Sequence, residues 1–315
     1  MSASVALIGG RGYAGAEFLR VLAAHPSMQL AFASSGSQAG RPLVEVCPEW
    51  PEPSDTFQRV ERDALKGLRA DAWVLAVPNA AATSWVDAIR AARADAVIVD
   101  LSADHRFARD WVYGLPELNR PKIRSARNIA NPGCYATGAQ LALAPVRDWL
   151  AGTPVVFGIS GYSGAGKRPS ARNDPERLRN NLIPYRLNGH VHEREISLHL
   201  QADVRFIPHV AEFFRGISLT VSARLDHAMD AKDLEQLYLE RYGGEKRVRL
   251  TTEVPEIRMV QRTPDVCIGG FSVDERDPRR ISLVAALDNL CKGAATQAMQ
   301  NLNLALDFDE NLGLD

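Results

Sequence analysis

The sequence contains little cysteine, no long apolar run and no surplus of charge of either sign. Its four cysteines, Cys47, Cys134, Cys267 and Cys291, lie far apart and form no CxxC pair, which argues against a zinc knot and against a disulfide framework. Lys and Arg number 37 against 38 Asp and Glu, so nothing predicts binding to nucleic acid or to an anionic membrane. No stretch is long and apolar enough to span a bilayer, and the opening MSASVALIGG lacks the basic leader of a signal peptide. A cytoplasmic protein with reduced thiols is the resulting expectation.

The first part of the chain alternates strand and helix patterns. Apolar segments bounded by turn residues predict strands at 5–8, 30–33, 72–77 and 96–101, and helical spacing of apolar residues predicts helices at about 14–22 and 81–92. Strands that alternate with helices indicate parallel βαβ units.

The pattern changes after Cys134. A helix is predicted at about 137–150, followed by strands at 155–159, 204–208, 216–223, 254–258 and 281–287, which indicates a mixed sheet in a second domain. Residues 160–190 are polar and rich in Gly, Arg and Asn, so they are predicted to form a long functional or mobile loop. A last helix at 292–306 is expected to return to the first domain.

The first predicted βα turn has the composition of a dinucleotide site. It reads Gly9-Gly10-Arg11-Gly12-Tyr13-Ala14-Gly15 and stands between a predicted strand and a predicted helix. Glycines let the backbone approach a pyrophosphate, and the following helix N-terminus favours that anion. The alternative is an ordinary glycine-rich turn, but the context favours a cofactor contact by Gly9, Gly12, Tyr13, Ala14 and Gly15.

The end of the second predicted strand lacks an acidic residue. An NAD site usually places a carboxylate here for the ribose 2′-hydroxyl, whereas this chain has Ser34, Ser35 and Ser37, with Arg41 shortly beyond. Hydroxyls and an arginine suit the 2′-phosphate of NADPH. The alternative is a solvated serine loop.

Cys134 has the setting of a nucleophile. Pro132 and Gly133 break the chain just before it, and a helix pattern starts just after it. A helix N-terminus favours the thiolate, which makes such a cysteine nucleophilic near neutral pH. The competing interpretation is a buried structural cysteine, which we adopt for the other three thiols.

A general base is predicted in Gly189-His190-Val191-His192, ahead of a helix expected to start near Glu193. His192 is the first choice and His190 the second. An HxH pair on a strand can bind a metal, but no third ligand is evident, so no metal is predicted. The other histidines stand singly and are interpreted as structural.

Motifs along nearly the whole chain resemble those of the N-acetyl-gamma-glutamyl-phosphate reductase family of arginine biosynthesis. They are GGRGYAG at 9–15, VDLSADHRF at 99–107, YGLPEL at 113–118, ANPGCYAT at 130–137, GYSGAG at 161–166, HVHEREI at 190–196, PHVAEFFRGI at 208–217 and DNLCKGAATQAMQNLN at 288–303. The resemblance implies a Rossmann-type parallel sheet domain and an α+β substrate domain with a mixed sheet, as in glyceraldehyde-phosphate dehydrogenase. It places the dinucleotide domain at 1–133, completed by 288–315, and the catalytic and oligomerisation domain at 134–287.

The resemblance also implies roles for residues. Cys134 is the nucleophile, the HVH segment supplies the base, NADPH is the reductant, and Ser163, Gly164, Gly166 and Asn289 line the nicotinamide side. Arg106, Lys167 and Arg215 lie in family-like motifs and are candidates for the phosphate and carboxylate of the substrate. The chain departs from the family at Ala136, where Pro is common, and in the segment that often reads HRHTPEI, where Val191, Glu193 and Arg194 differ. The missing arginine of that segment bears on the substrate contacts.

The expected reaction is the NADPH-dependent reduction of N-acetyl-gamma-glutamyl phosphate to the semialdehyde through a cysteine thioester. N-acetyl-aminoadipyl phosphate and aspartyl phosphate fit the same chemistry, since one methylene changes affinity by only about 1–3 kcal/mol. A nucleotide-binding regulator without catalysis and a metal hydrolase are alternatives of other classes. Family members are homodimers or homotetramers, so a homo-oligomer is expected.

Overall fold

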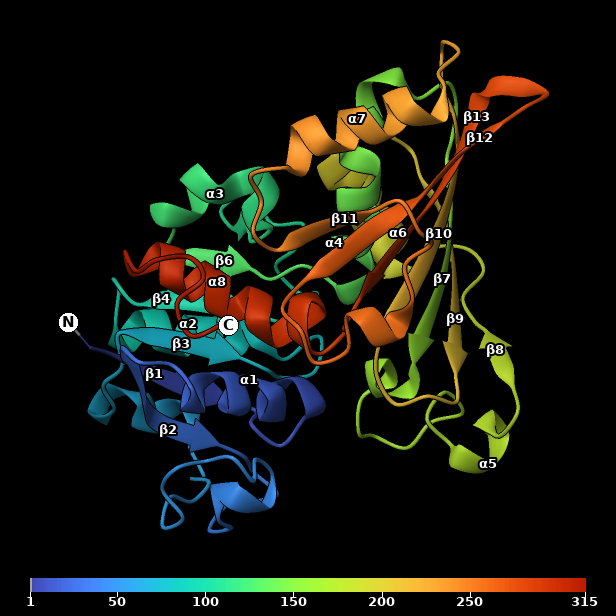
Figure 1. The fold of residues 1–315 in the computed structure, drawn as a ribbon. Coiled ribbons are helices and arrows are strands. Elements are labelled where there is room, and N and C mark those ends of the chain that lie inside the picture. Colours follow the sequence, from blue (N-terminus) through green and yellow to red (C-terminus); the bar gives the residue numbers. More distant parts are fainter. Residues whose placement is uncertain (1) are drawn as a thin grey trace. The chain divides into compact units, whose positions relative to one another are not determined.

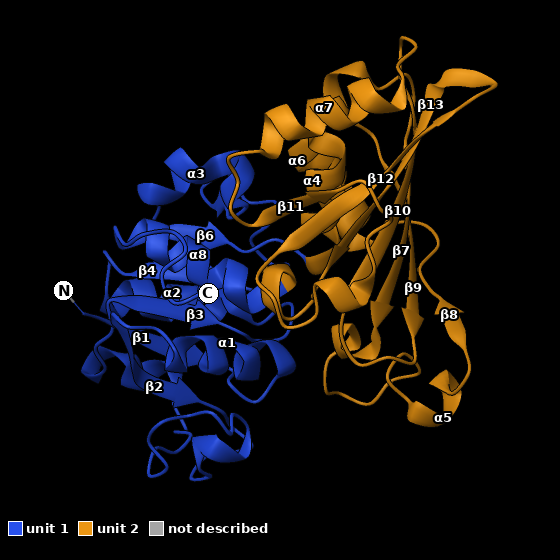
Figure 2. Cartoon of the chain, in the orientation of Figure 1, with its two compact units in different colours: residues 1–133, 294–315 blue, residues 134–293 orange. Residues whose placement is uncertain are grey.

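Residues 2–315 are described by the computed structural model, in which the chain divides into two units (Figure 2). The first unit consists of the chain up to Gly133 together with Ala294–Asp315, and the second is Cys134–Gly293. Each unit has its own sheet.

The first unit is built on a six-stranded sheet in the order β2-β1-β3-β4-β6-β5 (Figure 1). Every neighbouring pair in it runs parallel, which confirms the predicted Rossmann-type architecture. The strands are β1 (Ala3–Ile8), β2 (Met28–Ser34), β3 (Ala72–Leu75), β4 (Val97–Asp100), β5 (Val112–Tyr113) and β6 (Asn128–Ala130).

Side chains of the central strands alternate between two apolar layers, because successive residues of a strand point to opposite faces. In β1, Val5 and Leu7 join a layer formed with α1 (Tyr13–Ala23) and α8 (Thr296–Ala305), whereas Ala6 and Ile8 join a layer formed with α2 (Ala82–Ala92). The C-terminal helix α8 therefore supplies part of the core of the first unit. The remaining helix, α3 (Pro116–Arg124), contacts α8.

The second unit is built on a seven-stranded sheet in the order β11-β12-β13-β10-β7-β9-β8. Its pairs are both parallel and antiparallel, which confirms the predicted mixed sheet. The strands are β7 (Val155–Gly161), β8 (Leu182–Pro184), β9 (Arg205–Ala211), β10 (Ile217–Arg224), β11 (Val248–Thr251), β12 (Val266–Asp274) and β13 (Asp277–Leu287).

Three helices, α4 (Cys134–Leu143), α6 (Val191–Leu200) and α7 (Ala231–Tyr242), pack on this sheet. Helix α4 lies close against β10 and β13 because Gly138 has no side chain there, and a Cβ at this position would lie 2.6 Å from Leu219. Tyr242 donates from its hydroxyl to the Leu141 carbonyl at 2.7 Å, which satisfies a carbonyl near the end of α4.

Some predicted elements differ from the structure. The prediction of a strand at 254–258 is wrong, since this segment contains only the start of the 3₁₀ turn Ile257–Met259. The strand β12, which contains Gly269 and Gly270, was not predicted. The helix expected at 137–150 begins at Cys134 and gives way to a 3₁₀ segment, Ala144–Trp149, at Pro145. The expected loop at 160–190 contains α5 (Pro175–Leu178) and β8.

Within residues 2–315, no helix has both the length and the apolar character needed to cross a membrane.

Candidate active site

The glycine turn after β1 has the geometry of a dinucleotide cradle. The backbone N–H groups of Gly9 and Gly10 both donate to the Ser34 carbonyl at 3.0 Å, which ties the turn to the end of β2. Gly9 has φ +90°, and a Cβ there would lie 2.4 Å from the Ala76 carbonyl oxygen, so only glycine fits. A Cβ at Gly15 would lie 2.8 Å from Gly10, so glycine lets α1 pack on the turn.

The start of α1 suits an anion. Its N-cap is Gly12, no side chain caps the helix, and its first turn, which includes Tyr13 and Ala14, carries no acidic residue. Backbone N–H groups at such a terminus and the helix dipole favour a phosphate. The residues present therefore fit the pyrophosphate of a dinucleotide cofactor.

The serines at the end of β2 lie beside this turn. Ser34 and Ser35 are buried, and the Ser35 N–H donates to the Gln58 carbonyl. Arg41 is exposed and pairs with Glu45 at 2.9 Å and with Gln38 at 3.1 Å. An exposed ion pair of this kind is worth about 0–1 kcal/mol, so Glu45 does not prevent Arg41 from exchanging to a 2′-phosphate.

Arg106 is buried at the carboxyl ends of β4 and β6. It donates from Nε to the Asn131 carbonyl at 3.0 Å and from Nη2 to the Leu101 carbonyl at 2.9 Å. Asn131 also donates from its side chain to the Ala294 carbonyl and accepts from Asn301. Arg106 therefore holds the backbone that leads to Pro132 and Gly133.

Cys134 is the first residue of α4 and the only one of that helix with partial exposure. Gly293 approaches it so closely that a Cβ there would lie 2.6 Å from the Cys134 Cβ. The other cysteines are buried, and burial raises the pKa of the Cys47 thiol to about 11 and that of the Cys267 thiol above its usual value. Cys134 is thus the thiol that is placed to react.

Two phenols lie near the Cys134 thiol. Burial raises the pKa of Tyr135 and of Tyr185, and the negative charge of the Cys134 thiolate raises both further. Tyr135 donates from its hydroxyl to the His209 carbonyl at 2.6 Å. The Arg172 guanidinium lies 4.9 Å from the centre of the Tyr185 ring and opposes the rise in its pKa.

The two histidines of the HVH segment are adjacent but have different settings. His190 is buried and is the N-cap of α6, with Nδ1 accepting from the His192 N–H at 3.1 Å, which leaves the ring proton of neutral His190 on Nε2. Burial, then the charges of Arg186 and Arg172, lower the pKa of His190 to about 4. His192 is partly buried in the first turn of α6, with its ring centre 5.8 Å from that of Tyr135. The helix begins at Val191 rather than at Glu193.

Two of the four residues expected to line the nicotinamide side, Ser163 and Asn289, are hydrogen-bonded to each other. Asn289 donates from Nδ2 to the Ser163 Oγ at 2.9 Å and accepts on Oδ1 from the Gly216 N–H at 2.8 Å. A Cβ at Gly164 would lie 2.9 Å from the Ser160 hydroxyl, and Gly166 has φ +77° with open space around it.

The other two candidate cations, Arg215 and Lys167, differ in burial. Arg215 is buried and binds Asp288 through two bonds, from Nε at 2.6 Å and from Nη2 at 3.1 Å. Asp288 is fully buried and also accepts from the Arg262 N–H. Lys167 is exposed. The guanidinium of Arg215 is therefore engaged by a carboxylate of the chain itself.

Comparison with known proteins places this site in a family. Residues 4–126 match the model of a semialdehyde dehydrogenase NAD binding domain, and residues 134–289 match that of a semialdehyde dehydrogenase dimerisation domain. The chain is 47% identical to the N-acetyl-gamma-glutamyl-phosphate reductase of Xanthomonas campestris pv. campestris over 98% of this chain and 96% of the relative. The chain belongs to the N-acetyl-gamma-glutamyl-phosphate reductase family.

Membership in this family makes the chain an oxidoreductase that uses an NADP-type cofactor, and it confirms the resemblance found in the motifs. A reductase of the same name from Stenotrophomonas maltophilia is 46% identical over 98% of this chain and 96% of the relative. The chain is also 48% identical, over 99% of its length, to Protein arg-6, mitochondrial, of Neurospora crassa, of which it spans 36%.

Solved structures share the fold. Aspartate semialdehyde dehydrogenase II of Vibrio cholerae superposes with a TM-score of 0.79 over 98% of this chain and 99% of that chain, at 21% identity. At 21% identity, this structural similarity establishes only that the two proteins share a fold.

The structure also adds residues that the motifs did not single out for the site. Tyr185 and Arg172 lie in the polar segment 160–190, where no periodic pattern marks individual positions. Tyr135 belongs to the cysteine motif, in which only Cys134 has a predicted role. The only feature of the sequence that pointed to Tyr185 and Arg172 was the length and polarity of the segment 160–190.

Among residues 2–315, no group of three or more His, Cys, Asp and Glu side chains is arranged to hold a metal ion.

Proposed function

We propose that this chain catalyses the NADPH-dependent reduction of N-acetyl-gamma-glutamyl phosphate to N-acetylglutamate semialdehyde and phosphate, as a cytoplasmic step of arginine biosynthesis. The observation that carries the proposal is the placement of Cys134. It is a partly exposed thiol at the start of α4, among two phenols and in the same unit as the HVH pair, in a chain 47% identical to reductases named for this reaction.

Cys134 is the proposed nucleophile. Its sulfur attacks the acyl carbon, a C–S bond forms, and the bond from that carbon to the phosphate oxygen breaks, which leaves a thioester and inorganic phosphate. Bound NADPH supplies the hydride that reduces the thioester carbon. The C–S bond then breaks, and the aldehyde leaves as the Cys134 thiolate is restored.

His192 is the proposed proton carrier. It takes the proton of the thiol and gives it to the departing phosphate, and it then passes a proton taken from water to the Cys134 thiolate after the aldehyde has left. His190 is proposed as a positioning residue, because its Nδ1 accepts from the His192 N–H and its pKa of about 4 keeps it neutral at neutral pH. Its Nε2–H can donate to an oxygen of the substrate.

Three groups of residues are proposed to hold the cofactor. Gly9, Gly12 and Gly15 with the start of α1 would hold the pyrophosphate, and Ser34, Ser35 and Arg41 would hold the 2′-phosphate. Ser163, Gly164, Gly166 and Asn289 are proposed for the nicotinamide side.

The substrate's charges are proposed to be met by Arg106 and Lys167. Arg215 is a weaker candidate for direct contact, since both of its observed donors serve Asp288. We propose instead that Arg215 positions the Asp288–Asn289 segment.

A homodimer is proposed to form through the second unit, which matches a dimerisation domain model. In β7, Val156 is fully buried, whereas Val155 is 37% exposed and Phe157 is partly exposed. One sheet face thus presents apolar side chains to solvent, which a second copy would cover. Sedimentation of wild type and Phe157→Glu tests this, with Leu239→Glu on α7 as control; a wild-type monomer would contradict it.

The reaction is tested in reverse, by following NADP reduction with phosphate and one of three semialdehydes. N-acetylglutamate semialdehyde should give a kcat/KM at least about tenfold above those of N-acetyl-aminoadipate semialdehyde and aspartate semialdehyde. Cys134→Ser should abolish the signal with all three. A higher kcat/KM for aspartate semialdehyde would assign the alternative substrate, and an active Cys134→Ser would remove the cysteine mechanism.

A further inference from the structure

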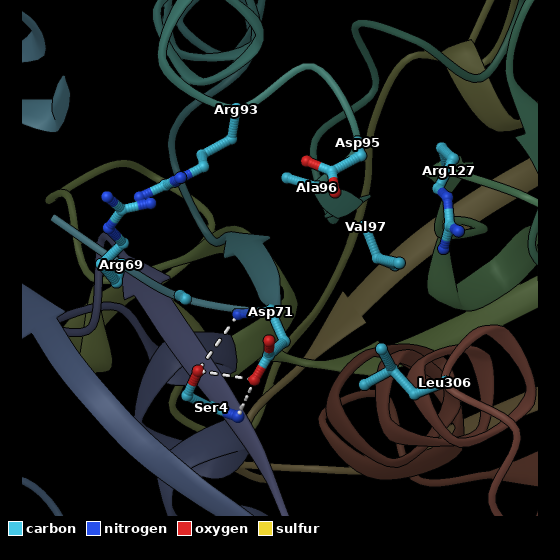
Figure 3. Close-up of a pocket in the computed structure, with 10 residues that line it drawn as sticks. Ser4, Arg69, Asp71, Arg93, Asp95, Ala96, Val97, Arg127 and Leu306 are labelled. Carbon is cyan, nitrogen blue, oxygen red and sulfur yellow. Dashed lines mark hydrogen bonds between the residues drawn. The ribbon is translucent and has the colours of Figure 1, made fainter.

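A pocket of about 380 Å³ lies at the amino-terminal edge of the parallel sheet of the first unit (Figure 3). Its residues come from the beginning of β1 and from the segments that lead into β3, β4 and β6, represented by Ser4, Asp71, Asp95 and Arg127. Open parallel sheets bind their nucleotide at the carboxyl ends of the strands, where the glycine turn lies here. The pocket is therefore distinct from the cofactor cradle, at the opposite edge of the same sheet.

Three arginines, Arg69, Arg93 and Arg127, line this pocket. Within residues 2–315, none of the three guanidinium groups makes an ion pair or a side-chain hydrogen bond. In Figure 3 the Arg69 and Arg93 side chains point toward one another, with no carboxylate drawn between them. Like charges that converge in this way repel, so an anion between them would stabilise the arrangement.

The carboxylates of the pocket do not neutralise it. Asp71 accepts on Oδ2 from the Ser4 N–H and from the Ser4 hydroxyl, both at 2.7 Å, as the dashed lines in Figure 3 show. These bonds lower the pKa of Asp71 and fix its carboxylate on β1. The lining has three arginines and two aspartates, Asp71 and Asp95, so its net charge is +1.

A fourth arginine lies next to the lining. Arg90 donates to the carbonyls of Ala94, Ala96 and Arg127, and the last two of these residues line the pocket. Burial, then the positive charge of Arg127, lower its pKa. Val97 and Leu306 supply an apolar part of the lining.

We propose that this pocket binds a small metabolite that carries two oxyanion groups, carboxylate or phosphate, on a short carbon frame. Paired guanidinium groups match the geometry of either oxyanion, and the volume suits a metabolite rather than a single halide ion. Arg69 and Arg93 would bind one anionic group and Arg127 the other, with the carbon frame against Val97 and Leu306.

Calorimetric titration of NADP-saturated protein at low ionic strength tests the proposal, with citrate as the carboxylate probe and inorganic pyrophosphate as the phosphate probe. Saturation with NADP blocks the cofactor cradle, which would otherwise also bind pyrophosphate. Saturable binding of at least one probe is expected, and added salt should weaken it. Binding of citrate alone or of pyrophosphate alone supports the site and identifies the class of its ligand.

Substitutions locate the binding. Arg93→Gln and Arg127→Gln should each weaken it by about tenfold, the usual effect of losing one hydrogen bond to a charged group. Arg109→Gln, at an exposed arginine elsewhere in the first unit, should leave it unchanged. No binding of either probe at millimolar concentration, or unchanged binding by the Arg93→Gln, Arg127→Gln double variant, would overturn the proposal. The result does not depend on catalysis, so it is independent of the proposed reaction.

Discussion

Replacing His190 by Asn should remove a large part of the pH dependence of stability. His190 is buried and caps α6 with its Nδ1. Burial, then the positive charges of Arg186 and Arg172, lower its pKa from 6.5 to about 4, although Glu193 opposes them. Asn is among the best N-cap residues, so it keeps an acceptor for the cap and removes only the titrating group.

The sign and size of the effect follow from the two pKa values. The folded-state pKa of His190 lies below that of the unfolded chain, so the unfolded chain takes up the proton first as the pH falls. Above about pH 6.5 both states are neutral at this residue, and its contribution to stability is fully present. Between pH 6.5 and about pH 4 the free energy of unfolding falls by about 1.4 kcal/mol per pH unit, or about 3 kcal/mol in all.

Urea unfolding at several pH values from 4 to 7.5 measures this difference. The free energies of unfolding of wild type and His190→Asn should differ by a constant amount above pH 6.5. Below it the wild type should lose about 3 kcal/mol more than the variant. Parallel curves over the whole range would show that folded His190 is protonated as readily as unfolded His190, and would refute the argument from burial.

Four further outcomes follow from the site and the core. Cys134→Ser should fold with an unchanged melting temperature and lose nearly all activity, and iodoacetamide should label the wild type first at Cys134; faster labelling of a buried thiol would contradict this. Arg215→Met should lower the free energy of unfolding by about 3–5 kcal/mol by calorimetry, since it leaves a buried carboxylate unpaired. Arg224→Met, which breaks a partly exposed ion pair, should cost about 0–1 kcal/mol, and equal effects of the two would refute the distinction. Asn301→Leu removes the donor to Gly114 and Asn131, so the free energy of unfolding should fall by about 1–3 kcal/mol for each acceptor left unpaired. An unchanged free energy of unfolding would show that water takes the place of the donor. Ser35→Asp should lower kcat/KM for NADPH at least about tenfold while sparing NADH, and equal use of both cofactors by the wild type would contradict the serine-loop hypothesis.

The sequence predicted the first sheet well because its central strands carry a simple signal. Each is a short apolar run, followed by Gly9 after β1, followed by Pro78 shortly after β3 and closed by Asp100 in β4, and both faces are buried in the structure. The missed strands β5 and β6 have two and three residues, too few for any periodicity to appear.

Errors in the second sheet come from turn residues inside strands. Val254 and Arg258 look like the ends of a short strand, but Pro255 cannot donate to a ladder, and Val254 is 62% exposed. The strand β12 contains Gly269 and Gly270, which read as a turn. Gly269 is required because a Cβ there would lie 2.3 Å from the Thr251 carbonyl, a contact between distant segments that no local pattern records.

Residues of the candidate site could be predicted from the sequence where a single residue type and its neighbours suggest the chemistry. Residues that come together only through a tertiary contact could not. Cys134 was found from its place after Pro132 and Gly133, and the structure puts it at a helix start. Arg172 and Tyr185 were not found, because their link is a contact between a cation and a ring across a non-periodic loop.

Several residues of the strongest motifs hold the backbone of the site, and this changes what a motif match implies. Arg215 and Asp288 come from two motifs far apart in the chain and neutralise each other in the core, and Asn289 joins Gly216 to Ser163. A buried arginine that already binds a carboxylate through two bonds loses that pair if it turns to a substrate, at a cost of several kcal/mol. A cation meant for a transient ligand must instead be held without a strong internal partner. By that criterion a charged residue within a motif is better evidence for the geometry of the site than for contact with the substrate.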